Sequence, residues 1–187
     1  MPKYYAFNVS LQGIEPRIWR QLLVRATSSF AELHAAIQDS FGWHDCHLWM
    51  FRTSGFDGRP IAGVPDDFGF ADRPTADASA VRLSEFFMSK AGAQRCTYVY
   101  DFGDDWTHEV KLIGVRRREE AFGRRLTGGA RSGPAEDCGG LPGYERAVEF
   151  RRAGNDPWGE GADLAEFLGD WQPDGFDLAQ AKAAFDR

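Results

Sequence analysis

Carboxylates, an imidazole and an indole are concentrated in residues 98–110 of the chain, a stretch with the sequence YVYDFGDDWTHEV. Two alternating strand patterns meet there at Gly103 and Asp104. Glycine supplies the positive φ that the first central position of a type II′ turn needs, so we expect a hairpin with these two residues at its tip. The hairpin would gather side chains that can bind a cation or transfer protons.

The register of this hairpin determines which side chains share a face. A two-residue turn at its tip pairs Asp101 with Trp106, and Val99 with His108. Because side chains alternate along a strand, we expect Asp101, Trp106 and His108 on one face. The opposite face would carry Tyr98, Tyr100, Thr107 and Glu109.

A candidate ligand-binding site follows from this arrangement. Its residues come from the hairpin and from a glycine-rich segment further along: Asp101, Asp104, Trp106, His108, Glu136 and Asp137. Carboxylates with one imidazole suit Mg²⁺, Mn²⁺ or Zn²⁺, but no spacing here is diagnostic, so the sequence assigns no metal or cofactor. The alternative is structural: the aspartates would serve the turn through local hydrogen bonds, and His108 would pack on Trp106.

A second cluster, His44-Asp45-Cys46-His47, lies at the start of an expected strand. Strand alternation would point the first and third side chains away from the second and fourth, so the four cannot hold one ion without a bend in the chain. His47 alone could reach the hairpin, and it joins the candidate binding residues. The alternative for His47, and our expectation for His34, is a packed ring. No serine or cysteine lies in a nucleophile motif, so catalytic residues are unassigned.

The elements that must position these residues follow from periodicity. Alternating aromatic and branched side chains predict strands at residues 3–12, 17–25 and 46–53, the first two forming a hairpin. Ser29 and Glu32 have the spacing of a capping box, which predicts a helix that ends at Gly42.

The second half of the chain is expected to contribute the central hairpin and short helices. The second hairpin strand should run from residue 106 to about residue 117. Helices are predicted at residues 81–90, 143–152, 162–168 and 177–185. Residues 55–80 and 122–142 lack a usable period and are expected to be loops.

This order of elements predicts an α+β fold, with one domain over residues 1–187. Its largely antiparallel sheet would have about five strands, two hairpins plus one strand, covered by helices. The length suits one domain, and neither an internal repeat nor an interdomain linker is visible. Strands and helices do not alternate and no phosphate-binding glycine motif is present, which disfavours a doubly wound nucleotide-binding fold.

Charge and composition limit the partners. The net charge of −6 disfavours nucleic acid, although arginines cluster between residues 116 and 131 and leave a local basic patch as an alternative. No apolar stretch is long enough to span a membrane and no export signal is visible, so we expect a soluble protein without a membrane partner. Cys46, Cys96 and Cys138 form no CxxC pair and leave one thiol unpaired, which favours a reducing, cytoplasmic location.

Four blocks of sequence resemble one known family, the ORF-three-like proteins of the root-inducing plasmid. The blocks are residues 18–20 (IWR), 33–43 (LHAAIQDSFGW), 98–108 (YVYDFGDDWTH) and 134–144 (PAEDCGGLPGY), and they occur in order across residues 4 to about 180. Where relatives usually have Cys-Pro-Pro-Glu-Asp, this chain has Gly133, Pro134 and Ala135 before Glu136. Any role of that cysteine in relatives therefore does not carry over.

The resemblance implies no established biochemical activity. Members are also labelled insertion-element passenger proteins of the TnpR type, which suggests an association with mobile genetic elements. A serine recombinase would need a catalytic serine among arginines near its N-terminus, and residues 1–30 do not match that arrangement. The label therefore indicates an association with neighbouring genes and does not indicate a mechanism.

Three hypotheses about function follow, and whether the protein is an enzyme stays open. The first is an intracellular binding or accessory module whose cleft, between the hairpin and residues 134–144, takes an unidentified small molecule or protein. The second is a metal-dependent hydrolase or nuclease that uses Asp101, Asp104, His108, Glu136 and Asp137. The third is a nucleic-acid accessory factor that acts through the arginine-rich segment.

Overall fold

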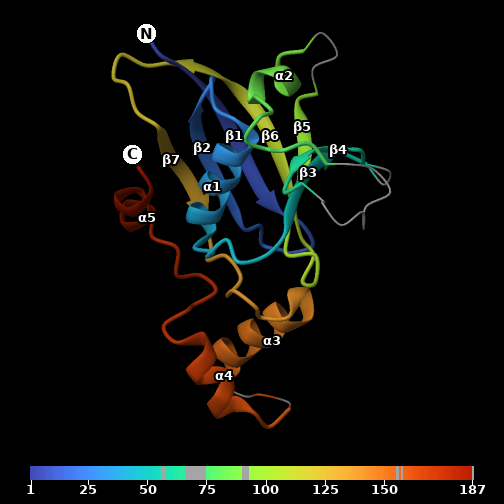
Figure 1. Cartoon of the computed structure of the whole chain (residues 1–187). Helices are drawn as coiled ribbons and strands as arrows, with labels where there is room; N and C mark the ends of the chain where they lie inside the picture. Colours follow the sequence, from blue (N-terminus) through green and yellow to red (C-terminus); the bar gives the residue numbers. More distant parts are fainter. Residues whose placement is uncertain (56–57, 66–74, 90–92, 155, 157, 187) are drawn as a thin grey trace.

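A seven-stranded sheet forms the centre of the computed structural model, which describes residues 1–55, 58–65, 75–89, 93–154, 156 and 158–186 (Figure 1). The strands are β1 (Lys3–Leu11), β2 (Trp19–Arg25), β3 (Trp49–Thr53), β4 (Pro60–Gly63), β5 (Arg95–Tyr100), β6 (Trp106–Arg117) and β7 (Arg124–Ala130). Their order is β4-β3-β5-β6-β1-β2-β7, and every pair of neighbours is antiparallel. The predicted α+β class and antiparallel sheet are confirmed.

The expected number of about five strands was wrong, because two strands lie in segments that we expected to be loops. β4 has the sequence PIAG and β7 the sequence RRLTGGA. Proline and glycine are poor strand formers, so only pairing with β3 and β2 places these residues in the sheet. Residues 56–57 and 66–74 of the expected loop at 55–80 lie outside the described residues.

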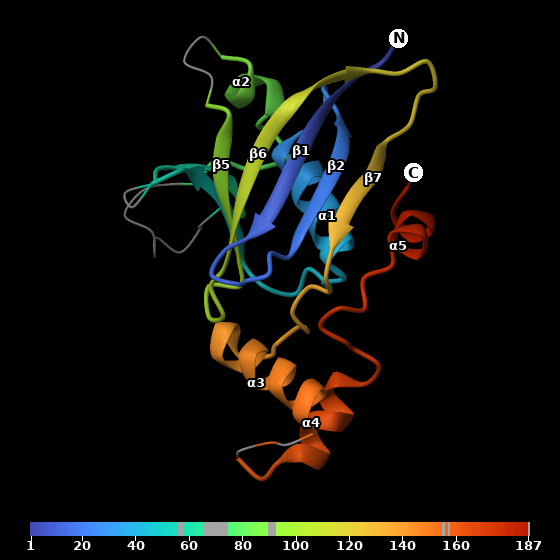
Figure 2. The same cartoon turned by 180° about the vertical axis from the view of Figure 1, so that it is seen from behind.

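The described residues include five helices that accompany the sheet: α1 (Phe30–Phe41), α2 (Leu83–Phe87), α3 (Gly140–Ala153), α4 (Gly161–Leu168) and α5 (Leu178–Phe185). α1 crosses one face of the sheet (Figure 1), and the described helices leave the opposite face uncovered (Figure 2). On that second face Tyr4 stacks on Phe122, with ring centroids 4.0 Å apart. α3 and α4 extend beyond the end of the sheet at which the β5–β6 loop lies (Figure 2).

Helix boundaries differ from expectation mainly at the N-termini. α3 begins at Gly140 rather than at residue 143, because its first turn contains glycines that carry no periodic signal. α2 covers only five residues of the expected 81–90, of which residue 90 lies outside the described residues. α4 and α5 lie within one residue of their predicted ends, which is the ordinary uncertainty of a helix terminus.

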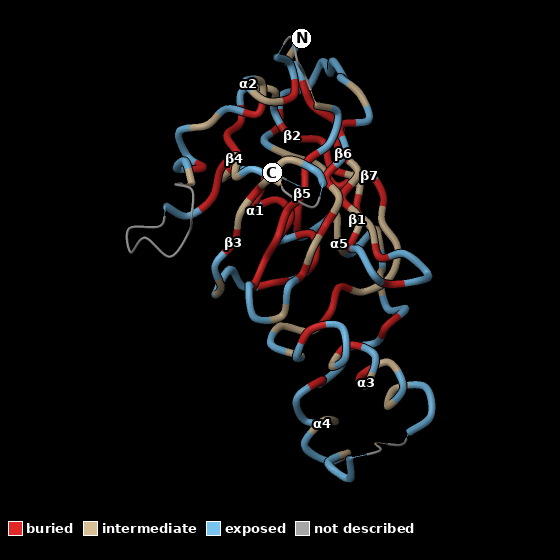
Figure 3. The backbone as a smooth tube through the Cα atoms, turned by 90° about the vertical axis from the view of Figure 1, so that its right-hand side faces the viewer, coloured by how far each residue is buried: buried red, intermediate tan, exposed pale blue. Residues whose placement is uncertain are grey.

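The core lies between α1 and the sheet. Figure 3 shows buried residues concentrated in the strands and α1, whereas most residues of α3 and α4 are intermediate or exposed. Phe30 of α1 is fully buried, and its ring centroid lies 4.9 Å from that of Phe51 on β3. Burying one such side chain contributes about 2–3 kcal/mol. This packing holds α1 against the sheet, and the position of α1 in turn determines where residues 43–48 begin.

Both ends of α1 confirm the prediction. Ser29 accepts a hydrogen bond from the Glu32 backbone N–H, and the Glu32 side chain accepts one from the Ser29 backbone, which completes the capping box. Gly42 adopts φ 82° and its N–H donates to the Gln38 carbonyl. The left-handed residue ends the helix and turns the chain into residues 43–48, which precede β3.

The expected hairpin turn was wrong by one residue in register. Tyr100 pairs with Trp106 and Tyr98 with His108, so residues 101–105 form a five-residue loop. The positive φ values belong to Asp101 (55°) and Asp105 (53°), and Gly103 is not left-handed. A one-residue shift exchanges the two faces of a strand, so the predicted grouping of Asp101 with Trp106 and His108 does not form.

We expect substitutions at Gly42 to differ in cost according to how well the new residue tolerates a left-handed backbone. A Cβ built there meets no atom within 4 Å in the part of the chain that the structure describes, so the cost comes from backbone strain. Gly42→Ala should lower the free energy of unfolding by about 1–2 kcal/mol, and Gly42→Asn should cost less because asparagine tolerates this conformation. Urea denaturation measures both, and equal losses in the two variants would contradict the assignment of strain.

Candidate functional site

His47 is the centre of a cluster of carboxylates at the end of the sheet. Its Nε2 lies 2.8 Å from Oδ1 of Asp137. The same nitrogen lies 3.7 Å from Oδ2 of Asp101 and 3.8 Å from Oε1 of Glu136. Four of the sequence-predicted site residues, from three separate segments of the chain, therefore meet around one imidazole nitrogen.

Cys46 also belongs to this cluster, and the sequence analysis did not include it. Ligand atoms of Cys46, His47 and Asp137 all lie within 4.8 Å of one another. The expected strand at 46–53 would have pointed Cys46 away from His47, but β3 begins only at Trp49. Asp45 adopts φ 56°, and this left-handed residue provides the bend that brings both side chains together.

Asp101 is oriented by its own backbone and by the loop that it begins. Its N–H donates to the Leu48 carbonyl over 2.9 Å, which joins the hairpin to the segment that carries His47. Its Oδ1 accepts hydrogen bonds from the N–H groups of Gly103 and Asp104, at 2.9 and 3.3 Å. The other oxygen, Oδ2, is the one that faces His47.

Glu136 is held between the sheet and the segment after α1. The Tyr100 hydroxyl donates to Oε1 over 2.9 Å, and the His44 backbone N–H donates to Oε2 over 2.8 Å. Burial raises the pKa of the Tyr100 hydroxyl, and the hydrogen bond to Glu136 raises it further. Tyr100 therefore keeps its proton and acts as a fixed donor to this carboxylate.

Two indoles attach the glycine-rich segment to the rest of the protein. Trp43 Nε1 donates to the Pro134 carbonyl over 3.0 Å, and Trp171 Nε1 donates to the Gly133 carbonyl over 2.7 Å. The segment then continues to Asp137, which has φ 57° and a side chain that is 63% exposed. The cluster is thus rigid on its inner side and open to solvent at Asp137.

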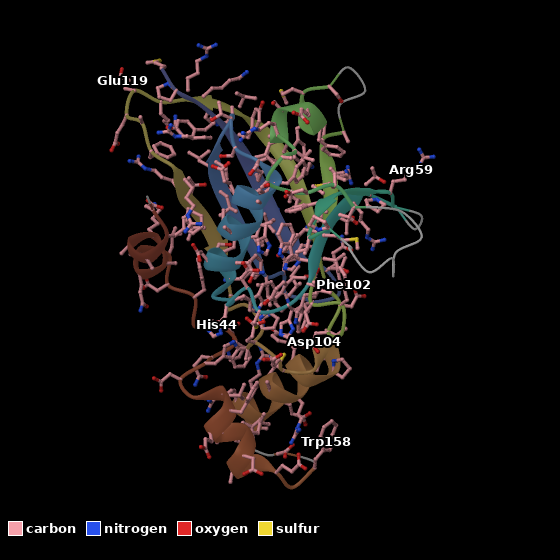
Figure 4. All side chains as sticks on the ribbon, in the orientation of Figure 1. His44, Arg59, Phe102, Asp104, Glu119 and Trp158 are labelled. Atoms are coloured by element: carbon pink, nitrogen blue, oxygen red, sulfur yellow. The ribbon has the colours of Figure 1, made fainter. Side chains whose placement is uncertain are left out.

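Asp104, another of the predicted site residues, contacts the N-terminus of α3 and lies outside the group around His47. Its Oδ2 accepts a hydrogen bond from the N–H of Gly139, the residue that caps the N-terminus of α3, over 3.1 Å. Figure 4 shows Asp104 beside the first turn of that helix. A carboxylate there is favourable because the helix dipole is positive at this end. Gly140 packs directly on the Asp104 backbone, since a Cβ at this position would lie 2.9 Å from the Asp104 carbonyl oxygen.

Trp106 and His108 point into the core. Trp106 is 4% exposed and His108 is fully buried, with its ring edge-to-face against Phe41 and Trp43. Burial lowers the pKa of His108 to about 3, and the charge of Arg20 acts in the same direction. His108 is therefore a neutral core residue, and His47 supplies the imidazole of the cluster.

His34 is packed as expected. Its ring stacks on Trp49 at 3.6 Å, and its nitrogens lie 2.8 Å from the Tyr98 hydroxyl and from Asp45. Burial lowers the pKa of His34, an effect that the Asp45 carboxylate opposes.

Half of the six arginines in the basic segment have acidic partners. Arg124 pairs with Asp39, Arg125 with Glu120 and Arg131 with Asp174. These ion pairs reduce the positive charge that the segment could offer to phosphates. Among the described helices, none has both the length and the apolar character needed to cross a bilayer.

The fold and the cluster define an α+β protein with one antiparallel sheet and a group of His, Cys and carboxylate side chains at its end. The chain belongs to the plasmid pRiA4b ORF-3-like protein family, whose model matches residues 3–180.

Two relatives extend this comparison. The uncharacterized protein y4hQ of Sinorhizobium fredii (strain NBRC 101917 / NGR234) is 34% identical over 152 residues, which are 80% of this chain and 72% of the relative. The crystal structure of MM3350, a protein of unknown function from Methanosarcina mazei Go1, is 32% identical and has a TM-score of 0.80. It covers 96% of this chain and 98% of its own. Neither relative transfers an activity to this protein.

The buried state of His108 predicts a loss of stability in acid. Its folded pKa of about 3 lies below the ordinary value of 6.5, so the unfolded chain binds the proton first as the pH falls. Stability should be complete above pH 6.5 and decline between pH 6.5 and 3, by about 1–2 kcal/mol between pH 7 and 5. His108→Phe should lose this component in urea denaturation measured across that range.

The control is His44→Ala, which removes an imidazole whose side chain is 78% exposed. This variant should keep the acid loss seen in the unsubstituted protein. Parallel stability curves for His108→Phe and the unsubstituted protein would show that His108 does not titrate on unfolding.

Proposed function

We propose that the protein binds a divalent transition-metal ion, with Zn²⁺ the preferred ion, through Cys46, His47 and Asp137. One observation carries the proposal: a thiol, an imidazole and a carboxylate from two distant segments have ligand atoms within 4.8 Å of one another. A thiolate with an imidazole favours Zn²⁺ over Mg²⁺ or Ca²⁺, which prefer oxygen ligands.

The state of His47 supports a cation as the ligand. Its Nε2 is buried and has no hydrogen-bond partner among the described residues, although Oδ1 of Asp137 lies only 2.8 Å away. The distance suits a hydrogen bond, but the ring N–H does not point at the oxygen. A neutral imidazole that directs its Nε2 lone pair at a metal ion, with Asp137 as a second ligand, would satisfy both groups.

The surrounding charge also favours a cation. Three carboxylates, those of Asp101, Glu136 and Asp137, lie within 4 Å of the same ring nitrogen. These three negative charges repel one another. Each of them would instead attract a divalent cation placed among them. Asp101 and Glu136 are each fixed by hydrogen bonds from backbone or Tyr100, which suits carboxylates that orient a metal site from its second layer.

Metal binding would add a direct link between residues 43–48 and residues 133–139, which supply the three ligands. The hairpin loop at 101–105 would contribute Asp101 from behind the ligands. The ion would stabilise this end of the protein by mass action. The proposed function is therefore a metal-binding module, which narrows the hypothesis of an unidentified ligand to an ion.

Isothermal titration of the reduced, chelator-treated protein tests this proposal. We expect one Zn²⁺ site that binds more tightly than Mn²⁺ or Mg²⁺, with affinity that falls at lower pH because the ligands must be deprotonated. His47→Ala and Cys46→Ser should each weaken Zn²⁺ binding by about 100-fold or more. This loss exceeds the roughly 10–100-fold loss of metal affinity typical when a residue that only hydrogen-bonds to a ligand is substituted.

Matched controls exist for both donor types. His44→Ala and Cys138→Ser remove an imidazole and a thiol near the cluster but outside the group of three. Burial raises the pKa of the Cys138 thiol to about 12, which disfavours the thiolate form that a metal ligand needs. Controls that lose affinity as much as the ligand variants, or an absence of Zn²⁺ binding, would refute the proposed site.

A second candidate function is metal-dependent hydrolysis, favoured by the number of ligands. Three protein ligands leave a tetrahedral ion one position for water, and Glu136 lies close enough to act as a general base. The Zn²⁺-loaded protein should then hydrolyse bis(p-nitrophenyl) phosphate faster than free Zn²⁺. Glu136→Gln should abolish that activity with a smaller effect on Zn²⁺ affinity. A rate equal to that of free Zn²⁺ would exclude this candidate and leave the binding proposal intact.

A further inference from the structure

We propose that a second site, between the β1–β2 turn and α3, binds a small aliphatic zwitterion of the α-amino acid type. The site is a cavity of about 370 Å³, lined by residues 13–15, by Arg131 just beyond β7 and by one side of α3. That volume lies within the range of about 300–1,000 Å³ typical of small-molecule sites. It shares no residue with the proposed metal cluster and does not depend on it.

The first observation is an unsatisfied hydroxyl in the wall of this cavity. Tyr144 of α3 is 3% exposed, and its ring lies edge-to-face on Trp171 with centroids 6.1 Å apart. Within the described part of the chain its hydroxyl is buried and has no hydrogen-bond partner. Burial raises the pKa of this hydroxyl, so it remains a neutral donor. A buried donor without a partner is costly, and an acceptor from a ligand would satisfy it.

The second observation is a buried positive charge beside that hydroxyl. The Arg131 side chain is 10% exposed, and it is held by a 2.8 Å bond to Asp174 and a 2.7 Å bond to the Pro16 carbonyl. These bonds use two of its five N–H donors. The charge of Arg131 lowers the pKa of Tyr144 against the larger effect of burial, which indicates that the two groups are close. A side-chain contact between the two also lowers that pKa, with the Tyr144 oxygen facing an Arg131 N–H, but it lacks standard hydrogen-bond geometry. The Tyr144 O–H and the remaining Arg131 N–H groups can therefore both donate to one carboxylate.

The remaining walls determine the rest of the ligand. The exposed charged side chains at the cavity are Glu15, Glu145, Glu149 and Arg152. The three carboxylates outnumber the one guanidinium, so this side of the cavity suits an ammonium group better than a dianion such as phosphate. Ile14 is 6% exposed and, with Val148 of α3, provides an apolar wall. A carboxylate, an ammonium group and a branched apolar side chain together describe an aliphatic amino acid.

Titration with L-leucine and two of its fragments tests the proposal. 4-Methylpentanoate lacks the ammonium group, and 3-methylbutylamine lacks the carboxylate. We expect saturable binding of L-leucine with a Kd of about 1 mM or lower, and binding at least about 10-fold weaker for each fragment. An absence of saturation up to about 50 mM L-leucine, or equal affinity for 4-methylpentanoate, would overturn the proposal.

Two variants locate the binding to this cavity. Tyr144→Phe removes only the hydroxyl, keeps the ring on Trp171, and should weaken L-leucine binding about 10-fold without lowering the Tm of the free protein. Glu149→Gln should weaken L-leucine and leave 4-methylpentanoate unchanged, whereas Glu166→Gln on α4 should change neither. Unaltered leucine affinity in Tyr144→Phe would show that the ligand binds elsewhere. His47→Ala should retain leucine binding, which separates this outcome from that of the metal site.

Discussion

The packing of Trp43 fixes the geometry of everything at this end of the protein. Its ring stacks on Tyr100 of β5 at 5.0 Å and on Phe41 at the end of α1 at 5.1 Å. Its indole nitrogen at the same time donates to Pro134 in the glycine-rich segment. One side chain therefore connects the helix, the sheet and the segment before α3. The Tyr100 hydroxyl in turn donates to Glu136, which holds this carboxylate in place beside His47.

The two histidines near the hairpin show how environment assigns different chemistry to one residue type. His108 is surrounded by aromatic rings, and burial lowers its pKa so far that it stays uncharged. His47 is 28% exposed and faces three carboxylates. The first imidazole contributes to packing, and the second is available to a cation. A sequence pattern that treats both as equal candidates cannot make this distinction.

Local signals predicted the parts of the fold that depend on local interactions. The capping box at Ser29, the stop at Gly42 and the alternation of the long strands are all properties of neighbouring residues, and the structure confirms them. The strand β7 and the register at Asp101 depend instead on distant pairing and on side-chain bonds to backbone amides. The sequence analysis placed His47 near the hairpin but missed Cys46 for the same reason. The left-handed bend at Asp45, which brings both side chains together, has no sequence pattern of its own.

The glycines at the start of α3 impose a steric limit on this region. A Cβ at Gly140 would lie 2.9 Å from the Asp104 carbonyl oxygen, and one at Gly143 would overlap the Cys138 carbonyl oxygen. Backbone thus rests on backbone at both positions, and no rotamer change can relieve the overlap. Gly140 rests on the hairpin loop, whereas Gly143 rests on the segment that leads into the helix itself. A larger residue at Gly140 would act as a wedge, moving α3 away from the hairpin loop and separating Asp104 from the helix terminus that it caps.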